Sequence, residues 1–266
     1  MTSRDKEPSA GSTTAVAPLR HFHRILGIDF FDGSAAEAIT IMRRGGLLVV
    51  PAAPALKDLD KDPEYRESLR NADLAITDSA FMVLIWNRLQ PKPIRRLSGL
   101  EYLRELLLQP DLRQPGSTLW IMASPASARR NLGWLEQQGI VVSEHCIYMA
   151  PMYGDRAVSD TALLERVNRL RPRHVIVTLG GGTQERLGLY LKRNLEYLPA
   201  IHCIGAAIAF LSGDQVHIPV WADRFYLGWL FRSLSEPGTY IPRYWGARKL
   251  LFLVLRYRER LPELKS

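Results

Sequence analysis

The chain has 266 residues, enough for one full hydrophobic core with appended segments. Hydrophobic residues make up 47% of it, but no apolar run approaches the ~18 residues that a membrane-spanning helix needs. The net charge of +8 favours a polyanionic partner, which is either nucleic acid, a phosphorylated substrate or an anionic lipid surface. The two cysteines, Cys146 and Cys203, form no CxxC pattern, which excludes a structural zinc site and suits a reduced cytoplasm.

The pattern of apolar residues predicts the fold class. Residues 1–20 are polar and rich in Ser, Thr and Pro, so we expect a disordered tail there. Short apolar runs and segments of helical periodicity then alternate. Strands are expected at 47–52, 72–78, 118–122, 140–148, 174–179 and 200–206, and helices at 34–44, 63–71, 99–108, 124–139, 159–170 and from 184. This alternation predicts an α/β domain over residues 21–213 with a Rossmann-like, doubly wound parallel sheet. Ligands of such sheets bind outside the carboxyl ends of the strands.

Three consecutive glycines follow the strand expected at 174–179. Gly180, Gly181 and Gly182 let the backbone approach a ligand closely, and the helix that begins behind them offers free N–H groups. These features are typical of a diphosphate cradle. A tight turn without any ligand is an equally good interpretation of three glycines alone. The segment is neither a GxGxxG fingerprint nor a Walker A loop.

Asp78 stands at the carboxyl end of the strand expected at 72–78, a good position for a general base. An aspartate in front of a helix is more often an N-cap, and we interpret Asp32, Asp62 and Asp160 in that way. Asp78 alone is therefore a weak signal.

The pair Arg95-Arg96 is the next candidate, because the guanidinium group donates two parallel hydrogen bonds to phosphate. Solvated loop charges are the alternative. No HxxxH or HExxH motif occurs, no EF-hand loop is complete, and no DxD motif stands at a strand end. The sequence therefore predicts neither a bound metal ion nor any other cofactor.

Residues 214–266 differ in composition from the rest of the chain. They contain three of the six tryptophans, and from Trp221 onward nine Lys and Arg stand against four Asp and Glu. Residues 246–260 place six apolar residues between basic flanks, which is typical of segments that lie in a membrane interface. We therefore predict a basic, aromatic, helical C-terminal appendage that associates with a membrane or binds substrate. A helix packed on the core is the alternative.

Six motifs, in their order and spacing, make the chain similar to the WecG/TagA/CpsF family of bacterial glycosyltransferases from about Leu26 to Tyr244. They are GIDFFDGSAAEAI (27–39), ADLAITDSAFMV (72–83), RRLSGLEYL (95–103), LGGGTQER (179–186), SGDQVHIPVW (212–221) and YLGWLFRSLSEP (226–237).

The resemblance implies an inverting enzyme of exopolysaccharide or cell-surface glycan synthesis, and the missing DxD motif predicts that this enzyme is metal-independent. It would move a hexose from a UDP-sugar to the sugar of an undecaprenyl-diphosphate carrier. Asp78 matches the family's proposed catalytic aspartate and would deprotonate the acceptor hydroxyl. The Gly180–Gly182 loop would hold the diphosphate, while Gln184 and Glu185 would order the nucleotide or the sugar. The arginines that would neutralise diphosphate charge are Arg96, Arg224, Arg232 and Arg243.

The sequence departs from the family pattern near the expected donor site. Pro51 and Ala53 replace Thr and Asn, Ser79 replaces Gly, and Ala209 replaces Asp. These differences make glucose and N-acetylmannosamine comparable candidates for the donor sugar. The resemblance implies a cytoplasmic protein held peripherally at the inner face of the cell membrane, and it leaves open whether the chain forms a homo-oligomer.

Two other functions stay open at this point. One is a catalytically degenerate UDP-sugar-binding protein with a regulatory or scaffold role. The other is a nucleic-acid-binding α/β protein, although no RRM, KH or helix-turn-helix pattern appears. Neither explains the six ordered motifs, so we expect no nucleic-acid partner.

Overall fold

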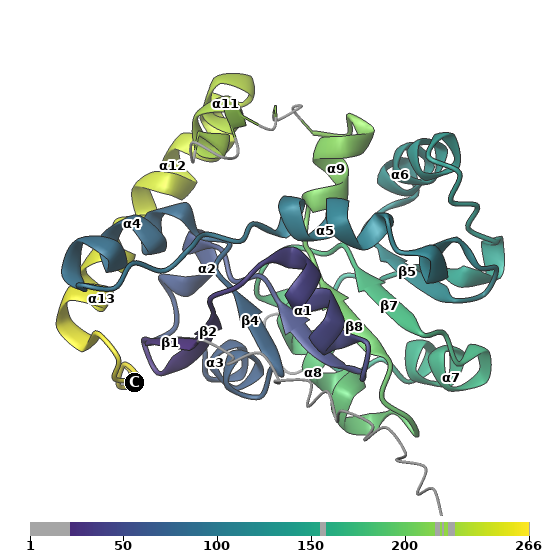
Figure 1. The fold of residues 1–266 in the computed structure, drawn as a ribbon, viewed down its shortest axis with the longest axis horizontal. Helices are drawn as coiled ribbons and strands as arrows, with labels where there is room; N and C mark the ends of the chain where they lie inside the picture. Colours follow the sequence, from purple (N-terminus) through teal and green to yellow (C-terminus); the bar gives the residue numbers. More distant parts are fainter. Residues whose placement is uncertain (1–21, 155–157, 216–218, 220, 223–226, 266) are drawn as a thin grey trace, which may run out of the picture.

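A computed structural model describes residues 22–265 except 155–157, 216–218, 220 and 223–226 (Figure 1). In this part of the chain eight strands form one sheet, in the order β1-β2-β4-β3-β8-β7-β5-β6. The strands are β1 (Phe22–Ile25), β2 (Ile28–Phe31), β3 (Gly46–Val49), β4 (Leu74–Ile76), β5 (Thr118–Met122), β6 (Ile147–Met149), β7 (His174–Val177) and β8 (Ala200–Cys203). β1 runs antiparallel to β2 and the other described pairs are parallel, so the carboxyl ends of β2 to β8 meet at one edge.

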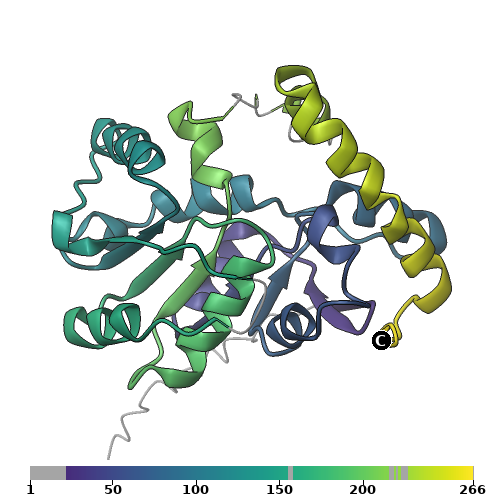
Figure 2. The ribbon, with the colours of Figure 1, turned by 180° about the vertical axis from the view of Figure 1, so that it is seen from behind.

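Helices cover both faces of this sheet, as Figures 1 and 2 show from opposite sides. One face is covered by α1 (Ala35–Met42), α5 (Gly99–Leu107), α6 (Pro125–Gln137) and α9 (Ala207–Ser212). The other is covered by α2 (Ala53–Leu56), α3 (Pro63–Arg70), α4 (Ala80–Leu89), α7 (Thr161–Leu170), α8 (Thr183–Asn194) and α13 (Lys249–Tyr257). Because both faces are covered, every residue of β3, β5 and β7 is buried, which explains their unbroken apolar runs. The Rossmann-like, doubly wound fold expected from the sequence is confirmed.

The helix starts follow from capping residues. Asp62 accepts a hydrogen bond from Tyr65 N at 2.8 Å, and Asp160 accepts one from Leu163 N at 2.9 Å, so both are N-caps as expected. The same interpretation is wrong for Asp32. Ser34 caps α1 instead, and the Asp32 carboxylate accepts from the backbone of a distant loop.

Two other expectations differ from the structure. The strand expected at 140–148 is limited to β6, and the short 3₁₀ helix η2 (Glu144–Cys146) precedes it. β6 lies at the edge of the sheet and pairs only with β5 among the described strands, over the three residues Ile147–Met149. The helix α4 is an addition to the predicted elements. It begins at the N-cap Ser79, to which the sequence analysis gave no capping role.

The C-terminal helices divide into two parts. The helices α11 (Gly228–Ser235) and α12 (Pro237–Ala247) stand above the carboxyl edge of the sheet, at the same end as α9 (Figure 1). The helix α13 instead packs beside α4, with Leu250, Leu253 and Val254 buried in the core. Three of the six apolar residues of the expected interfacial segment are therefore buried against the core.

The end of the chain is fastened to the α/β domain. Leu26 N donates to Arg258 O at 2.6 Å, which joins the β1–β2 hairpin to the segment behind α13. The fully buried Asp60 carboxylate binds Lys249 Nζ at 2.5 Å and Lys265 Nζ at 3.0 Å. Residues 249–265 are thus attached to the α/β domain, although the sequence composition groups them with the appendage. None of the helices in the described residues combines the length and the apolarity needed to cross a bilayer.

Candidate functional site

A cavity of about 1060 Å³ opens at the carboxyl edge of the sheet. Its floor is formed by residues that follow five neighbouring strands, and α11 and α12 contribute to its wall. In sheet order the floor residues are Asp78 after β4, Val50 after β3, Gly205 after β8, Gly180 after β7 and Ala123 after β5. The cavity is where a parallel α/β sheet is expected to bind a ligand.

Asp78 is placed by two helices at once. Ser79 Oγ accepts from Met82 N at 3.1 Å and is the N-cap of α4, so Asp78 does not cap the helix that follows it. Its carboxylate instead accepts a hydrogen bond from Gly99 N, at 2.9 Å, where α5 begins. The positive end of the helix dipole stabilises an ionised carboxylate at this position. The hydrogen bond from Gly99 N therefore fixes the Asp78 carboxylate at the cavity floor.

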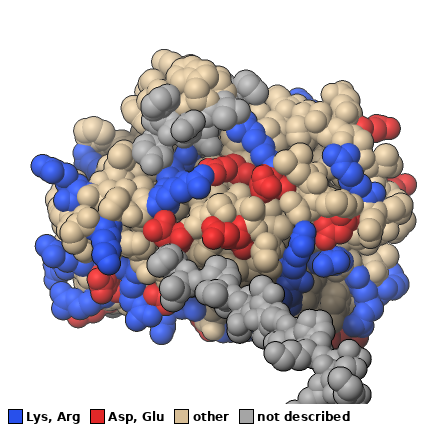
Figure 3. Space-filling model, in the orientation of Figure 1, with Lys and Arg blue, Asp and Glu red and all other residues tan. Residues whose placement is uncertain are grey.

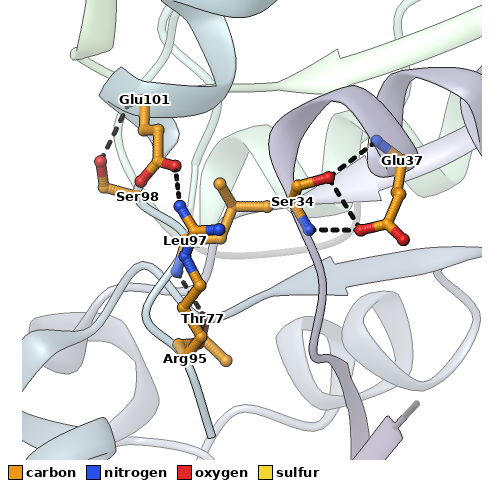
Figure 4. Close-up of polar contacts among 7 residues, drawn as sticks. All are labelled: Ser34, Glu37, Thr77, Arg95, Leu97, Ser98 and Glu101. Carbon is orange, nitrogen blue, oxygen red and sulfur yellow. Dashed lines mark hydrogen bonds and ion pairs between the residues drawn. The ribbon is translucent and has the colours of Figure 1, made fainter.

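The loop that brings α5 to Asp78 is anchored on the residue before Asp78 (Figure 4). Thr77 Oγ1 donates to Arg95 O at 2.7 Å and accepts from Leu97 N at 2.8 Å. Thr77 is fully buried, so these two bonds replace water and fix the loop against the end of β4. This explains why Gly99, only two residues further on, reaches the carboxylate.

The two adjacent arginines have different positions. Arg95 pairs with Glu101, Nη2 to Oε1 at 2.6 Å, on the outer side of α5 (Figure 4). Arg96 lines the cavity, and its Nε donates to Asp78 O at 3.0 Å. Arg96 is therefore the member of the pair that a phosphate in the cavity would meet.

The glycine loop lies in the middle of the cavity floor. Gly180 and Gly181 line the cavity and are exposed to it. A Cβ on Gly180 would meet no atom within 4 Å, so the space in front of the loop is open to a ligand. Gly182 has φ +91°, a conformation that favours glycine, and it begins α8 without a side-chain cap. The loop has the geometry expected of an anion site at a helix N-terminus.

Gln184 and Glu185 lie beneath this loop. Glu185 is fully buried and Gln184 is 2% exposed. Both Glu185 oxygens accept hydrogen bonds from protein groups, Gly182 N at 2.6 Å and Gln184 Nε2 at 2.9 Å. Burial raises the pKa of Glu185 to about 7 in spite of these bonds. Glu185 supports the loop from beneath, whereas Gln184 also reaches the cavity wall.

The structure does not describe the side chains of the three arginines proposed in the C-terminal segment. Arg224 lies outside the described residues. Arg232 and Arg243 lie on α11 and α12, the two helices beside the cavity, while their side chains fall outside the described part. Within the described residues, no group of three His, Cys, Asp or Glu side chains could hold a metal ion.

Two groups of cavity residues were not among the site residues predicted individually from the sequence. One is polar: Ser127 Oγ donates to Asp214 Oδ2 at 2.6 Å, and the buried Asn131 lies one helical turn further along α6. Ser127 and Asn131 are spaced i, i+4 on α6, so the sequence could have indicated that they share one face of that helix. The other is apolar and exposed. It consists of Phe81, Leu84, Trp229, Leu234, Ile241 and Trp245 on α4, α11 and α12. We call this second group the apolar rim.

A strand-end carboxylate and a glycine loop in one cavity of a parallel sheet are typical of α/β enzymes that act on phosphorylated ligands. Sequence comparison gives the family. The chain belongs to the glycosyl transferase WecG/TagA/CpsF family, which matches residues 23–264. The resemblance expected from the six motifs is confirmed, and the protein is a transferase of that family.

A relative in Bacillus spizizenii is 23% identical over 239 residues, which cover 82% of this chain and 86% of that protein. It is an N-acetylglucosaminyldiphosphoundecaprenol N-acetyl-beta-D-mannosaminyltransferase.

Proposed function

We propose that this chain is an inverting glycosyltransferase that moves a hexose from a UDP-sugar to the sugar of an undecaprenyl-diphosphate-linked acceptor. The observation that carries the proposal is that Asp78 and the Gly180–Gly182 loop line the same cavity. The family and the acceptor named for the Bacillus spizizenii relative support the same conclusion.

Asp78 acts as the general base in this proposal. The acceptor hydroxyl attacks the anomeric carbon as its proton passes to the Asp78 carboxylate. The bond between that carbon and the phosphate oxygen breaks on the opposite face, and UDP leaves with the electron pair. Inversion follows because one displacement occurs. Arg96 and the N-terminus of α8 are suited to stabilise the negative charge that develops on the leaving diphosphate.

The strand order indicates how the donor is oriented in the cavity. Asp78 follows β4, the glycine loop follows β7, and Ser127 stands behind β5 at the far side. If the diphosphate lies on the loop and the anomeric carbon faces Asp78, the nucleoside points toward α6. Ser127, Asn131 and Asp214 provide hydrogen-bonding groups on that side. We therefore assign the nucleoside to the α6 side and the sugar to the Asp78 side.

The acceptor then enters from the side of α4 and α12. The apolar rim is found there, with Leu84 53% exposed and Trp245 66% exposed. Exposed apolar groups around a cavity suit a lipid-linked substrate at a membrane surface. This supports the peripheral location at the inner face of the cell membrane. Figure 3 shows Lys and Arg side chains along the edge of the molecule that carries α13.

The donor sugar is either glucose or N-acetylmannosamine. Ala53 and Ala209 line the cavity where the family pattern has Asn and Asp, so these parts of the wall are apolar in this chain. A turnover screen of UDP-sugars against short-chain lipid-diphosphate acceptors tests the proposal. A product of inverted anomeric configuration, identified by NMR, is the expected result. UDP-sugar binding without turnover of any donor would support the regulatory or scaffold role instead.

A further inference from the structure

The glycine loop and the Gly205 turn are neighbouring parts of the cavity floor. The loop follows β7 and the turn follows β8, and these strands are paired up to Val177 and Cys203. Beyond that pair the two backbones form separate loops. Gly205 has φ +58° and is buried, so its turn is a defined conformation that favours glycine.

A continuous chain of hydrogen bonds, two of them buried and one part-buried, joins the two loops. Gly182 N donates to Glu185 Oε2 at 2.6 Å, Gln184 Nε2 donates to Glu185 Oε1 at 2.9 Å, and Gly205 N donates to Gln184 Oε1 at 2.6 Å. Each side chain therefore uses both of its polar ends. A carboxylate accepts at both oxygens, whereas a side-chain amide both accepts and donates. The two side chains together can therefore accept from two backbone N–H groups and still form a hydrogen bond with each other.

This arrangement is unusual in its burial. At α1 the corresponding glutamate, Glu37, is bound by Ser34 near the surface (Figure 4), and no burial is required to cap that helix. Glu185 makes the equivalent bond while fully buried, where an ionised carboxylate is costly. The additional feature at α8 is the link through Gln184 to Gly205. The burial of Glu185 is therefore explained by its link through Gln184 to Gly205 and not by the capping of α8.

We infer that Gln184 and Glu185 are positioning residues that hold the glycine loop and the Gly205 turn together as one preformed surface for the donor diphosphate. The inference rests on the proposed function for the identity of the ligand. Glu185 acts through the backbone of Gly182 and through Gln184, and it makes no contact with the donor. Preformed backbone donors need no reorganisation when charge develops, which is the condition for effective electrostatic stabilisation.

Proton binding to Glu185 should disturb this surface. Ionised Glu185 accepts both bonds, whereas the protonated carboxyl becomes a donor at one oxygen and loses an acceptor. Burial raises its pKa to about 7, so the chain of bonds is complete above that pH and is weakened as pH falls below it. The Tyr65 hydroxyl and the Cys203 thiol keep their protons in this range. Burial raises the pKa of Tyr65 and of Cys203 well above their ordinary values, and Arg186 is paired with Asp62 at 2.9 Å.

Hydrogen exchange tests the coupling without any ligand. In Glu185→Gln the side chain has one oxygen that accepts and one NH₂ group that donates, whereas both of its partners, Gly182 N and Gln184 Nε2, are donors. One hydrogen bond of the chain is therefore lost. Exchange should accelerate by about five- to tenfold in both segments, 179–186 and 203–207, which is the effect expected from one buried hydrogen bond. Acceleration limited to 179–186, or no acceleration, would overturn the inference. The matched control is Glu37→Gln, which changes the same position of another helix and should affect neither segment.

The reciprocal exchange of the two side chains provides a rescue. In Gln184→Glu combined with Glu185→Gln, the carboxylate accepts from Gly205 N and from the new amide, and that amide accepts from Gly182 N. All three bonds can form again, so exchange in both segments should return to within about twofold of wild type. If Glu185→Gln acts only by disturbing α8, the second substitution should accelerate exchange further instead of restoring it. Faster exchange in the double variant than in Glu185→Gln would overturn the inference.

Calorimetry with UDP-glucose tests the effect on the donor, because its diphosphate does not titrate near neutral pH. Wild-type affinity should fall about fivefold from pH 8 to pH 6. Glu185→Gln should bind more weakly at pH 8 and show little dependence on pH. Equal affinity in wild type and variant at both pH values would overturn the link to the donor. If wild type binds neither UDP-glucose nor UDP-N-acetylmannosamine, the proposed donor class fails, while hydrogen exchange still decides the coupling of the loops.

Discussion

The carboxylate of Asp78 accepts a hydrogen bond from the backbone N–H of Gly99, with 2.9 Å between Oδ1 and N. The bond joins the end of β4 to the beginning of α5, two elements that are separated by α4 and a loop. It uses one of the four N–H groups that a helix leaves without an intrahelical partner. The same bond keeps the carboxylate at the cavity instead of at the N-terminus of α4.

The first prediction is that Asp78→Asn abolishes transfer and leaves the fold intact. An asparagine oxygen still accepts from Gly99 N, so the thermal midpoint and UDP binding should stay close to wild type. General-base catalysis contributes about 10²–10⁴-fold, and kcat should fall by that factor. Asp29→Asn is the control, since Asp29 is an exposed strand residue paired with Arg24. Activity of Asp78→Asn within threefold of wild type would show that another group is the base.

Much of the fold followed from local sequence patterns. The buried runs of β3, β5 and β7 and the N-caps Asp62 and Asp160 are set by residues next to each other in the chain. Such signals do not depend on tertiary contacts, so they could be interpreted without a structure. The glycine loop and the position of Asp78 at a strand end were predictable for the same reason.

The contacts between distant residues could not be predicted in this way. The pattern around Arg95 and Arg96 does not say which side chain faces the cavity, because Thr77 decides how the loop lies on β4. The six apolar residues of α13 likewise could not be divided into a buried and an exposed side. That division depends on α4, which lies about 160 residues earlier.

The second prediction concerns the glycine loop. A Cβ added at position 181 meets only Ala55 Cβ, at 3.6 Å, and Gly181 is not in the left-handed region, so we expect Gly181→Val to fold normally. Its side chain would project in front of the loop and weaken UDP affinity at least about tenfold by calorimetry. Gly182→Val is the informative contrast, because φ +91° makes that substitution strained and should lower the thermal midpoint. Unchanged UDP affinity in folded Gly181→Val would reduce the loop to a turn.

The third prediction is that transfer survives removal of divalent ions. No DxD motif stands at a strand end, while Arg96 lines the cavity close to Asp78. A guanidinium group can stabilise a leaving diphosphate in place of a metal ion. Turnover in excess EDTA should stay within about twofold of turnover in Mg²⁺ or Mn²⁺. Activity that disappears in the chelator and returns with either ion would contradict the prediction. Arg96→Ala should lower kcat under both conditions.

The last prediction separates the two sides of α13. Leu250, Leu253 and Val254 are buried, whereas Phe252 is 66% exposed and Leu255 is 46% exposed. Deletion of the whole segment would remove core residues and the Lys249–Asp60 pair, so it cannot test membrane binding alone. Substitution of the exposed side chains can do so.

Phe252→Ser combined with Leu255→Ser should release the protein from anionic vesicles while the thermal midpoint stays close to wild type. Loss of two partly inserted side chains should weaken binding at least about tenfold, since full burial of each contributes about 1.5–3 kcal/mol. The basic flank of Arg256, Arg258 and Arg260 remains, so the residual binding should be sensitive to salt.

Leu253→Ser is the matched control for this double substitution, because it changes a buried leucine of the same helix. It should lower the thermal midpoint and affect vesicle binding only through unfolding. Turnover gives a second measurement. Activity of the double variant on a long-chain lipid acceptor should fall more than its activity on a water-soluble analogue, since only the former requires the cavity to be held at a lipid surface. If wild type does not sediment with anionic vesicles at low salt, or if the double variant binds them equally well, the exposed side of α13 has no membrane role.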